Sequence, residues 1–148
     1  MKSPLLSAGK YEIDNYYNAL YLLYLFAGSQ NQQLEVAFDT GSDWLVVASE
    51  ECSCTFAPMF DETESFTYVR INDQLQAQYY GDGEIYGYYG TDDVYLDRDR
   101  TVGVLEFPML LANYANNLNS ESGVFGFSRN FEIYGIDPGP LYYHYLYD

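Results

Sequence analysis

Short apolar segments rich in tyrosine, separated by turn-forming residues, recur along this chain and limit what it can fold into. Aromatic side chains favour half-buried strands over helices, and tyrosine alone occurs 18 times. Many short strands at intervals of about 8–12 residues are typical of an all-β barrel or sandwich. A length of 148 residues is enough for one domain that buries its own core. We therefore predict a single all-β domain over residues 1–148.

Turn residues set the limits of the strands that we expect. Asp82-Gly83 is a strong turn signal, because this pair favours positive backbone angles. Pro108 is expected to split two strands, the segment 50–64 to form a loop, and the residues after Pro140 to open a helix. The strands are expected at 16–26, 34–38, 44–47, 66–71, 75–80, 85–89, 94–96, 102–107, 109–114 and 123–127.

The chain is strongly acidic, with a formal charge of −16. Nucleic acid and anionic membrane surfaces are not expected partners, since there is no basic patch to displace counterions. Two interpretations of the acidity stay open: a well-solvated surface, or an acidic working environment that protonates many carboxylates. The longest apolar run, 19–27, is much shorter than the roughly 18 residues of a membrane span. Polar residues precede it, so we expect neither a membrane span nor a signal peptide in the chain as given.

The cysteines, Cys52 and Cys54, are separated by one residue. A zinc site usually needs a wider spacing and a second pair of ligands, and the single histidine, His144, lies far away in the sequence. We therefore expect no metal and no cofactor, and we interpret His144 as a surface or packing residue. A disulfide and two free thiols both remain open, because so short a bridge would be strained.

A polar turn, Asp-Thr-Gly-Ser-Asp at 39–43, lies between two strongly apolar segments. A carboxylate placed between two buried strands is held rigidly and partly desolvated, so it can serve in either protonation state, as acid–base chemistry requires. Loops held by rigid strands are also where functional groups concentrate. Asp39 is therefore the candidate catalytic residue, and the alternative is an ordinary turn.

Around Asp39 the sequence resembles the pepsin family of aspartic proteases. The segment 36–47, Val-Ala-Phe-Asp-Thr-Gly-Ser-Asp-Trp-Leu-Val-Val, is similar to the first active-site segment of that family. Other landmarks follow in family order and at roughly family spacing, which makes the combination more specific than any one motif. They are an N-terminal strand at 14–21, a turn at 28–32, a shortened disulfide loop at 52–54, a segment at 59–68, a flap tip at 79–83 and a strand at 122–127.

The resemblance implies both a fold and an activity. The fold is the N-terminal lobe of a pepsin-like acid protease, a closed or partly open β-barrel with a flap hairpin and few short helices. Residues 1–13 would be a propeptide tail or an extra edge strand. The implied activity is that of an aspartic endopeptidase acting on peptide or protein substrates at acidic pH. Its implied setting is secreted, lysosomal or vacuolar.

The resemblance also implies roles for four residues of the turn. Asp39 would be one of two carboxylates that hold and activate a water molecule. Thr40 would contribute to the hydrogen-bonded grip between two active-site loops. Gly41 would let the backbone approach the site closely, and Ser42 would hydrogen-bond the Asp39 carboxylate.

Outside the turn, the resemblance assigns a flap and a pocket. Tyr80 would be the flap tyrosine that closes over the substrate. Gly81 and Gly83 would be its hinge-like neighbours, with Asp82 between them at the tip. Val124 would line the pocket beside the scissile bond.

The chain departs from the family pattern at two positions. Val46 stands where the family usually has an aromatic residue that hydrogen-bonds the flap tyrosine, so that bond is not expected here. Trp44 is a candidate to compensate from a different direction. Ser122 replaces a common aspartate, which we expect to affect local hydrogen bonding more than catalysis.

The chemistry of this family needs two carboxylates, and the chain has a single Asp-Thr-Gly. Three interpretations follow. The chain is one lobe of a two-lobe enzyme whose C-terminal lobe carries the second aspartate; or two copies form a homodimer, as retroviral proteases do; or the lobe is catalytically silent and acts as a binding or structural subunit. The expected partner is accordingly a second protease lobe, either a C-terminal lobe or a second copy.

Overall fold

The computed structural model describes residues 11–17, 20–81, 83–116, 123–128 and 140–145. Regular structure in these residues is almost entirely β-strand, apart from the 3-10 helix η1 (Glu62–Glu64) and the α-helix α1 (Tyr142–Tyr145). The strands are β1 (Asp14–Tyr16), β2 (Leu20–Ala27), β3 (Gln32–Asp39), β4 (Leu45–Ser53), β5 (Val69–Arg70), β6 (Gln76–Tyr80), β7 (Gly83–Tyr95), β8 (Gly103–Asn116) and β9 (Gly123–Gly126).

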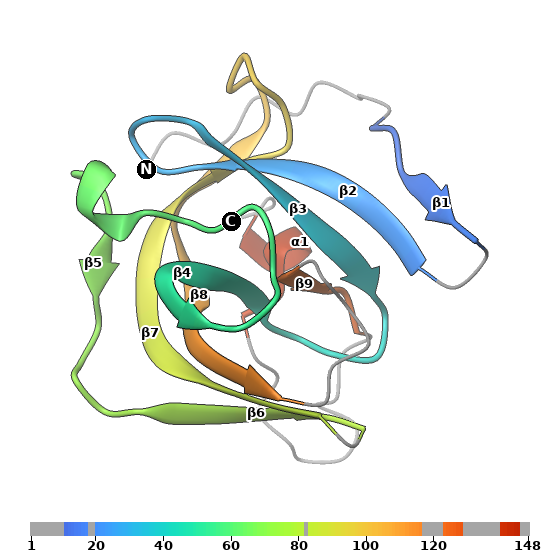
Figure 1. The fold of residues 1–148 in the computed structure, drawn as a ribbon. Coiled ribbons are helices and arrows are strands. Elements are labelled where there is room, and N and C mark those ends of the chain that lie inside the picture. The colour runs from blue at the N-terminus through green and yellow to red at the C-terminus, as the bar shows by residue number, and fades with distance from the viewer. Residues whose placement is uncertain (1–10, 18–19, 82, 117–122, 129–139, 146–148) are drawn as a thin grey trace.

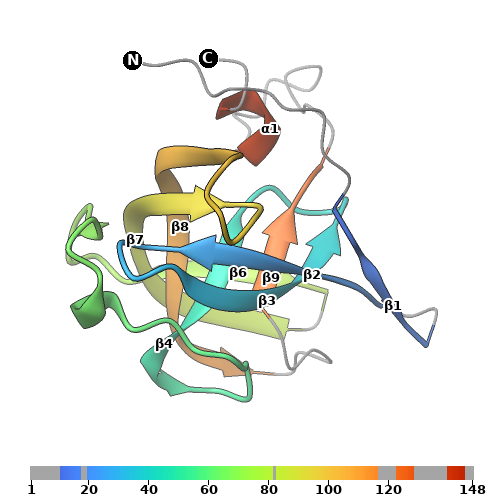
Figure 2. The same ribbon diagram turned by 90° about the horizontal axis from the view of Figure 1, so that it is seen from above.

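The strands close into a barrel. From β2, the pairing runs through β3, β9, β4, β8 and β7, and β7 pairs with β2 again through Phe26 opposite Tyr95. The long bent strands β7 and β8 wrap around one side, β1 lies beside β2, and β6 lies beside β7 as the other arm of a hairpin (Figures 1 and 2). Closure gives most strands partners on both sides. The predicted all-β barrel is confirmed.

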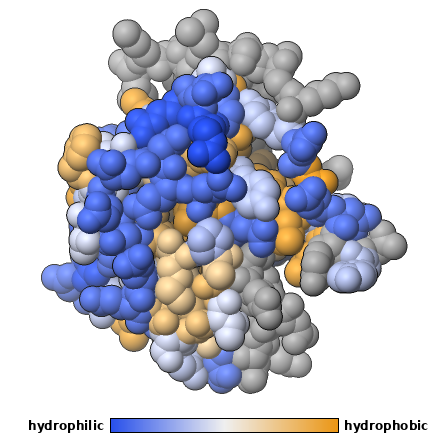
Figure 3. Space-filling view, turned by 45° about the horizontal axis from the view of Figure 1, so that its top comes forward, coloured by the Kyte–Doolittle hydropathy of each residue, from blue (hydrophilic) through white to orange (hydrophobic). Residues whose placement is uncertain are grey.

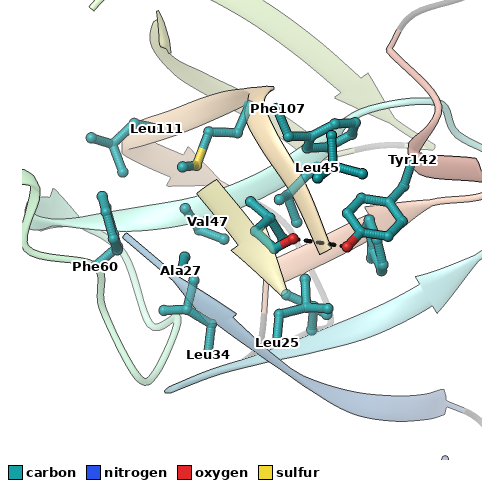
Figure 4. Packing of buried hydrophobic residues seen from close by; sticks show 14 of the residues in the cluster. Leu25, Ala27, Leu34, Leu45, Val47, Phe60, Phe107, Leu111 and Tyr142 are labelled. Atoms are coloured by element: carbon teal, nitrogen blue, oxygen red, sulfur yellow. Dashed lines mark hydrogen bonds between the residues drawn. The ribbon is translucent and has the colours of Figure 1, made fainter. Parts of the chain in front are cut away.

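Buried aliphatic and aromatic side chains fill the barrel (Figure 4). Leu25 and Ala27 both point inward because alternate residues of a strand face the same side. Tyr142 of α1 joins this cluster, with its ring edge-on to Phe107 at a centroid distance of 5.1 Å. Its hydroxyl donates to the Val94 carbonyl oxygen at 2.8 Å, which satisfies the polar end of a buried tyrosine.

A second apolar cluster lies on the opposite face of β4. Val46 and Ala48 belong to it, whereas Leu45 and Val47 face the barrel interior. It also contains buried residues of β7, β8 and β9. Three partly buried aromatic residues pack against it, namely Trp44, Tyr80 and Tyr89. The flap region and the residues after Asp39 therefore share one apolar base.

The prediction of one continuous strand over 16–26 is wrong. β1 and β2 are separate antiparallel strands, with Tyr16 opposite Leu20. Tyr17 has a φ of 53°, in the left-handed region where a strand cannot continue. The chain therefore reverses at this point and forms a short hairpin.

The predicted break at Pro108 is also wrong, because β8 passes through it opposite Thr91. The ladder instead shifts register nearby, where Asp92 pairs with Phe107 and Val94 with Val104. Between those pairs Glu106 has a φ of 53°, and its amide donates to the Asp93 carboxylate at 3.1 Å. Such a bulge takes up the irregularity, and proline is tolerated next to bulges.

Smaller differences concern strand lengths. The segment predicted as a loop at 50–64 begins as strand, since β4 continues to Ser53. The two strands expected at 85–89 and 94–96 are one strand, β7. In the part of the chain that the structure describes, no helix is long and apolar enough to cross a membrane.

Candidate active site

Asp39 is the last residue of β3, and its side chain is partly buried. Its Oδ1 atom accepts a hydrogen bond from the Gly41 amide at 2.9 Å. A Cβ atom at Gly41 would lie 3.3 Å from that same oxygen, so glycine leaves room for the carboxylate. Thr40 is exposed beside it. The Asp-Thr-Gly turn thus presents one carboxylate at the end of a rigid strand.

The strand β9 holds this turn from both sides. It runs parallel to β3, with Asp39 opposite Gly126, and antiparallel to β4. Three backbone bonds fasten the turn: Phe127 N to Asp39 O at 2.7 Å, Gly126 N to Trp44 O at 3.0 Å, and Ser128 N to Ser42 O at 2.9 Å. The position of the carboxylate is therefore fixed mainly by backbone.

Glycine is required at this junction. A Cβ atom on Gly126 would lie 2.6 Å from the backbone nitrogens of Asp43 and Trp44. A Cβ atom on Gly123 would lie 2.5 Å from the Val46 carbonyl oxygen. Both distances are shorter than van der Waals contact allows, so β9 fits between its neighbours only with glycine at these positions.

Val124, between these two glycines, is only 7% exposed. It pairs with Ala37 of β3 and Val46 of β4. Its side chain packs in the second apolar cluster. The structure therefore places the predicted pocket residue beneath the aromatic residues that pack on that cluster.

The predicted flap is the hairpin of β6 and β7. Tyr80 pairs with Gly83, and Gly81 at the turn has a φ of 57°, which favours glycine. Asp82 lies outside the described residues. The hairpin lies at the bottom of Figure 1, beyond the barrel.

Tyr80 brings the flap to the carboxylate. Burial raises the pKa of its phenol above the ordinary value of 10.0, and the negative charges of Asp39 and Asp43 raise it further. Ser42 is near enough to lower that pKa in part. Tyr80 also packs against the second apolar cluster beside Trp44, which follows the Asp39 turn.

The predicted hydrogen bond from Ser42 to the Asp39 carboxylate is absent. Among the described residues, neither the Ser42 Oγ atom nor the Tyr80 hydroxyl has a hydrogen-bond partner, although both atoms are buried. The Gly41 amide supplies the bond to Asp39 instead, because the turn folds this amide back onto Oδ1.

The sequence did not identify Tyr89 and Gln78 as parts of this region. The Tyr89 ring stacks on Trp44 with centroids 4.1 Å apart and an interplanar angle of 11°. The Tyr89 hydroxyl accepts a hydrogen bond from the Gln78 side-chain amide at 2.9 Å. One sequence signal pointed to a different contact with the flap: Trp44 is adjacent to the turn, whereas Val46 replaces the aromatic residue that the family pattern has.

An apolar groove of about 470 Å³ opens beside the carboxylate strand. Phe38 and Phe127 both line it, and their rings stack at a centroid distance of 4.5 Å. Phe38 precedes Asp39, and the Phe127 amide bonds the Asp39 carbonyl oxygen. The groove therefore adjoins the end of β3 that carries the carboxylate.

The remaining predicted residues lie elsewhere. Cys52 and Cys54 form a disulfide at the end of β4, with Cα atoms 5.4 Å apart. Within the described ranges, no cluster of three or more His, Cys, Asp or Glu side chains is placed to hold a metal ion. His144 lies in α1, and Ser122 lies outside the described residues.

Among the described residues, Asp39 is the carboxylate at the end of β3, and Asp43 is a second carboxylate of the same turn. A carboxylate at this position can in principle accept or donate one proton. Water-mediated hydrolysis that needs an acid and a base at once would require a second group of the same kind.

Comparison with known proteins agrees with this geometry. The family model described as eukaryotic aspartyl protease matches residues 20–136. Pepsin A of Gallus gallus is 30% identical over 98% of this chain and 34% of its own length. Vacuolar protease A of Aspergillus fumigatus is 29% identical over 84% of this chain and 30% of its own length. Gastricsin of Cavia porcellus is 39% identical over 55% of this chain and 21% of its own length. The chain thus spans about a third or less of these relatives.

Proposed function

The chain belongs to the eukaryotic aspartyl protease family, and from this premise we propose that it is the N-terminal lobe of an aspartic endopeptidase with Asp39 as one of its two catalytic carboxylates. One observation carries the proposal. Asp39 stands at the end of β3, fixed by the β9 backbone bonds, and Trp44, which follows this turn, packs with Tyr80 of the flap on one apolar cluster. A carboxylate held in this way needs no rearrangement to meet a bound peptide.

In the proposed reaction, two carboxylates share one proton and hold a water molecule between them. The ionised carboxylate takes a proton from the water, whose oxygen bonds to the peptide carbonyl carbon. The protonated carboxyl gives its proton to the peptide nitrogen, and the carbon–nitrogen bond breaks. The products are a carboxyl group and an amine, and the pair ends with one proton as it began. Asp39 supplies one of the two groups, with the Gly41 amide fixing one of its oxygens.

The second carboxylate comes, in this proposal, from another lobe. The chain holds one Asp-Thr-Gly and spans about a third of Pepsin A. The apolar groove next to β3, lined by Phe38 and Phe127, supports an association on this side. Apolar side chains also gather at the lower centre and right of the face in Figure 3, between hydrophilic areas. The partner is a C-terminal lobe, with a second copy of the chain as the alternative.

We place the activity at acidic pH, in a secreted, lysosomal or vacuolar setting. The formal charge of −16 supports this, since acid reduces the self-repulsion of so many carboxylates. A relative named Vacuolar protease A supports it as well. Gly81, Asp82 and Gly83 would let the flap move, Thr40 would grip the facing loop, and Val124 would border the substrate pocket.

The test combines size-exclusion chromatography with a peptide-cleavage assay between about pH 3 and 5. Asp39→Asn should lower cleavage by about 100- to 10,000-fold, because it removes a general base. Asp99→Asn is the matched control, since Asp99 is an exposed turn residue. Both variants should keep the elution volume and the denaturation midpoint of the parent chain.

Each outcome distinguishes one form of the proposal. A monomer that cleaves only after a C-terminal lobe is added supports the two-lobe enzyme. A dimer that cleaves alone, and stops when Asp39 is changed, supports the homodimer. Cleavage that survives Asp39→Asn in every assembly would rule out Asp39 as the catalytic carboxylate. A stable complex with no cleavage in either variant would support a silent binding subunit instead.

A further inference from the structure

The flap strand β6 has backbone support along one edge only. Among the described strands, β6 pairs with β7 and with no other. Its second restraint must therefore come from side chains. Gln78 and Tyr80 lie two residues apart, so they face the same side of the strand. Tyr80 packs against the second apolar cluster together with Trp44, so this side faces the residues that follow the Asp39 turn.

Tyr80 itself does not fasten the flap. Its hydroxyl is buried without a hydrogen-bond partner among the described residues. Val46, which faces the second apolar cluster with Tyr80, is aliphatic and offers no polar atom. At Val46 the tip of the flap therefore meets an apolar side chain, where the family pattern has a hydrogen-bonding aromatic.

A different set of side chains links the flap to the catalytic turn. Trp44 follows the turn directly, and its carbonyl oxygen accepts the Gly126 amide, so it belongs to the rigid part. Its indole stacks nearly parallel on the Tyr89 ring, at 4.1 Å and 11°. Tyr89 in turn receives the Gln78 side-chain amide at 2.9 Å. This path runs from the turn to the inner face of β6 without using Tyr80.

We propose that Trp44, Tyr89 and Gln78 form a side-chain tether that holds β6 over the Asp39 carboxylate. They act as positioning residues: Trp44 fixes Tyr89, and Tyr89 fixes β6 through Gln78. In the family pattern, the flap tyrosine is hydrogen-bonded to an aromatic residue at the position of Val46. The tether replaces the support that this bond would give. Its importance for peptide hydrolysis rests on the proposed function, whereas its existence does not.

Hydrogen–deuterium exchange of the 148-residue chain tests the tether without any substrate. Tyr89→Phe removes the acceptor hydroxyl and keeps the ring, and Trp44→Leu removes the stack. In both variants the amides of β6 should exchange at least about tenfold faster, because opening of a single-edged strand costs less free energy. The amides of β2, β3 and β9 should stay within about twofold of the parent chain.

The chain provides matched controls. Tyr88→Phe changes the neighbouring tyrosine, whose ring lies under the Arg70 guanidinium instead, and it should leave β6 unaffected. Trp44→Phe should restore most of the protection lost in Trp44→Leu, because a ring can still stack on Tyr89. Trp44 is the single tryptophan, so its fluorescence should change in Tyr89→Leu and not in Tyr88→Leu.

The outcomes separate this inference from the proposed function. Unchanged exchange of β6 in both Tyr89→Phe and Trp44→Leu overturns the tether. A uniform rise across all strands also overturns it, since the residues would then be ordinary core. If the chain shows the local effect but cleaves no peptide, either as a dimer or after a C-terminal lobe is added, the tether stands and the proposed function fails. In an assembly that cleaves, Asp39→Asn should lower cleavage by about 100- to 10,000-fold and leave β6 exchange as it was.

Discussion

The turn that carries Asp39 and the flap that faces it are fixed in different ways. Backbone bonds from β9 hold the turn on both sides. The flap strand β6 is hydrogen-bonded along one edge and otherwise rests on the side chains of Gln78 and Tyr80. Backbone pairing on two sides produces a position that hardly varies, whereas one pairing and a few side chains produce one that can open. A carboxylate needs the first kind of support, and a lid that admits a substrate needs the second.

The largest expected effect on stability comes from replacing one glycine beside the Asp39 turn and one glycine in the flap. Gly126→Ala places a Cβ atom 2.6 Å from two backbone nitrogens of the turn. It should lower the free energy of unfolding by about 3 kcal/mol, because neither strand can move aside. Gly81→Ala meets no atom within 4 Å and carries only the strain of a φ of 57°. It should cost about 1–2 kcal/mol, confined to the flap. Urea denaturation gives the global values, and equal losses in the two variants would contradict the comparison.

The next largest effect on stability concerns a buried carboxylate in β7. This strand forms the flap with its first residues and the barrel with its last. Asp92 of β7 is 0% exposed. It accepts bonds from the hydroxyls of Ser65 at 2.7 Å and Thr67 at 2.6 Å, and from the Asp93 amide at 2.8 Å. Asp92→Ala should lower the free energy of unfolding by about 2–3 kcal/mol, because these donors lose their acceptor.

Asp92→Asn is the matched control, since an amide oxygen can still accept part of these bonds. Its loss should be smaller than that of Asp92→Ala. In both variants the exchange rate of the β6 amides should not track the change in global stability. The reason is that the Asp92 network lies in the barrel half of β7. A faster β6 with an unchanged barrel would show instead that Asp92 supports the flap.

The sequence predicted the parts of the site that depend on local chemistry. The polar turn at Asp39 and the turn before Gly83 were expected from residue types that favour turns, whereas the role of Gly41 was expected only from the family resemblance. The contacts between distant segments were not predicted. Nothing near Gln78 indicates that its amide will meet Tyr89, because that contact depends on the register of β6 and β7.

The failures in the fold have the same origin. Pro108 was expected to end a strand because it lacks an amide hydrogen, yet a bulge at Glu106 moves the ladder so that β8 continues. Ser42 was expected to bond Asp39, but the turn geometry gives that position to the Gly41 amide. In both cases the position of a neighbouring backbone group decided the result. Backbone groups are chemically the same in nearly every residue, so the sequence does not indicate where they will lie.

The smallest expected effect uses alkaline pH to compare a flap tyrosine with a core tyrosine. Burial raises the pKa of both Tyr80 and Tyr142 above 10.0, and Asp39 and Asp43 add to the effect at Tyr80. A group whose pKa is higher in the folded state stabilises the fold fully below its unfolded pKa and less as the pH rises above it. The free energy of unfolding should therefore begin to fall above about pH 10, by at most about 1.4 kcal/mol per pH unit for each tyrosine.

Tyr80→Phe and Tyr142→Phe should each remove part of this fall, measured by urea denaturation between about pH 8 and 11. At neutral pH they should differ. Tyr142→Phe loses the bond to the Val94 carbonyl oxygen and should cost about 1 kcal/mol, whereas Tyr80→Phe removes a hydroxyl that has no partner among the described residues and should be nearly neutral or stabilising. A flap that opens freely would let water reach the Tyr80 phenol before the barrel unfolds. In that case Tyr80→Phe would leave the alkaline fall unchanged, and the flap would have to be looser than its side-chain contacts indicate.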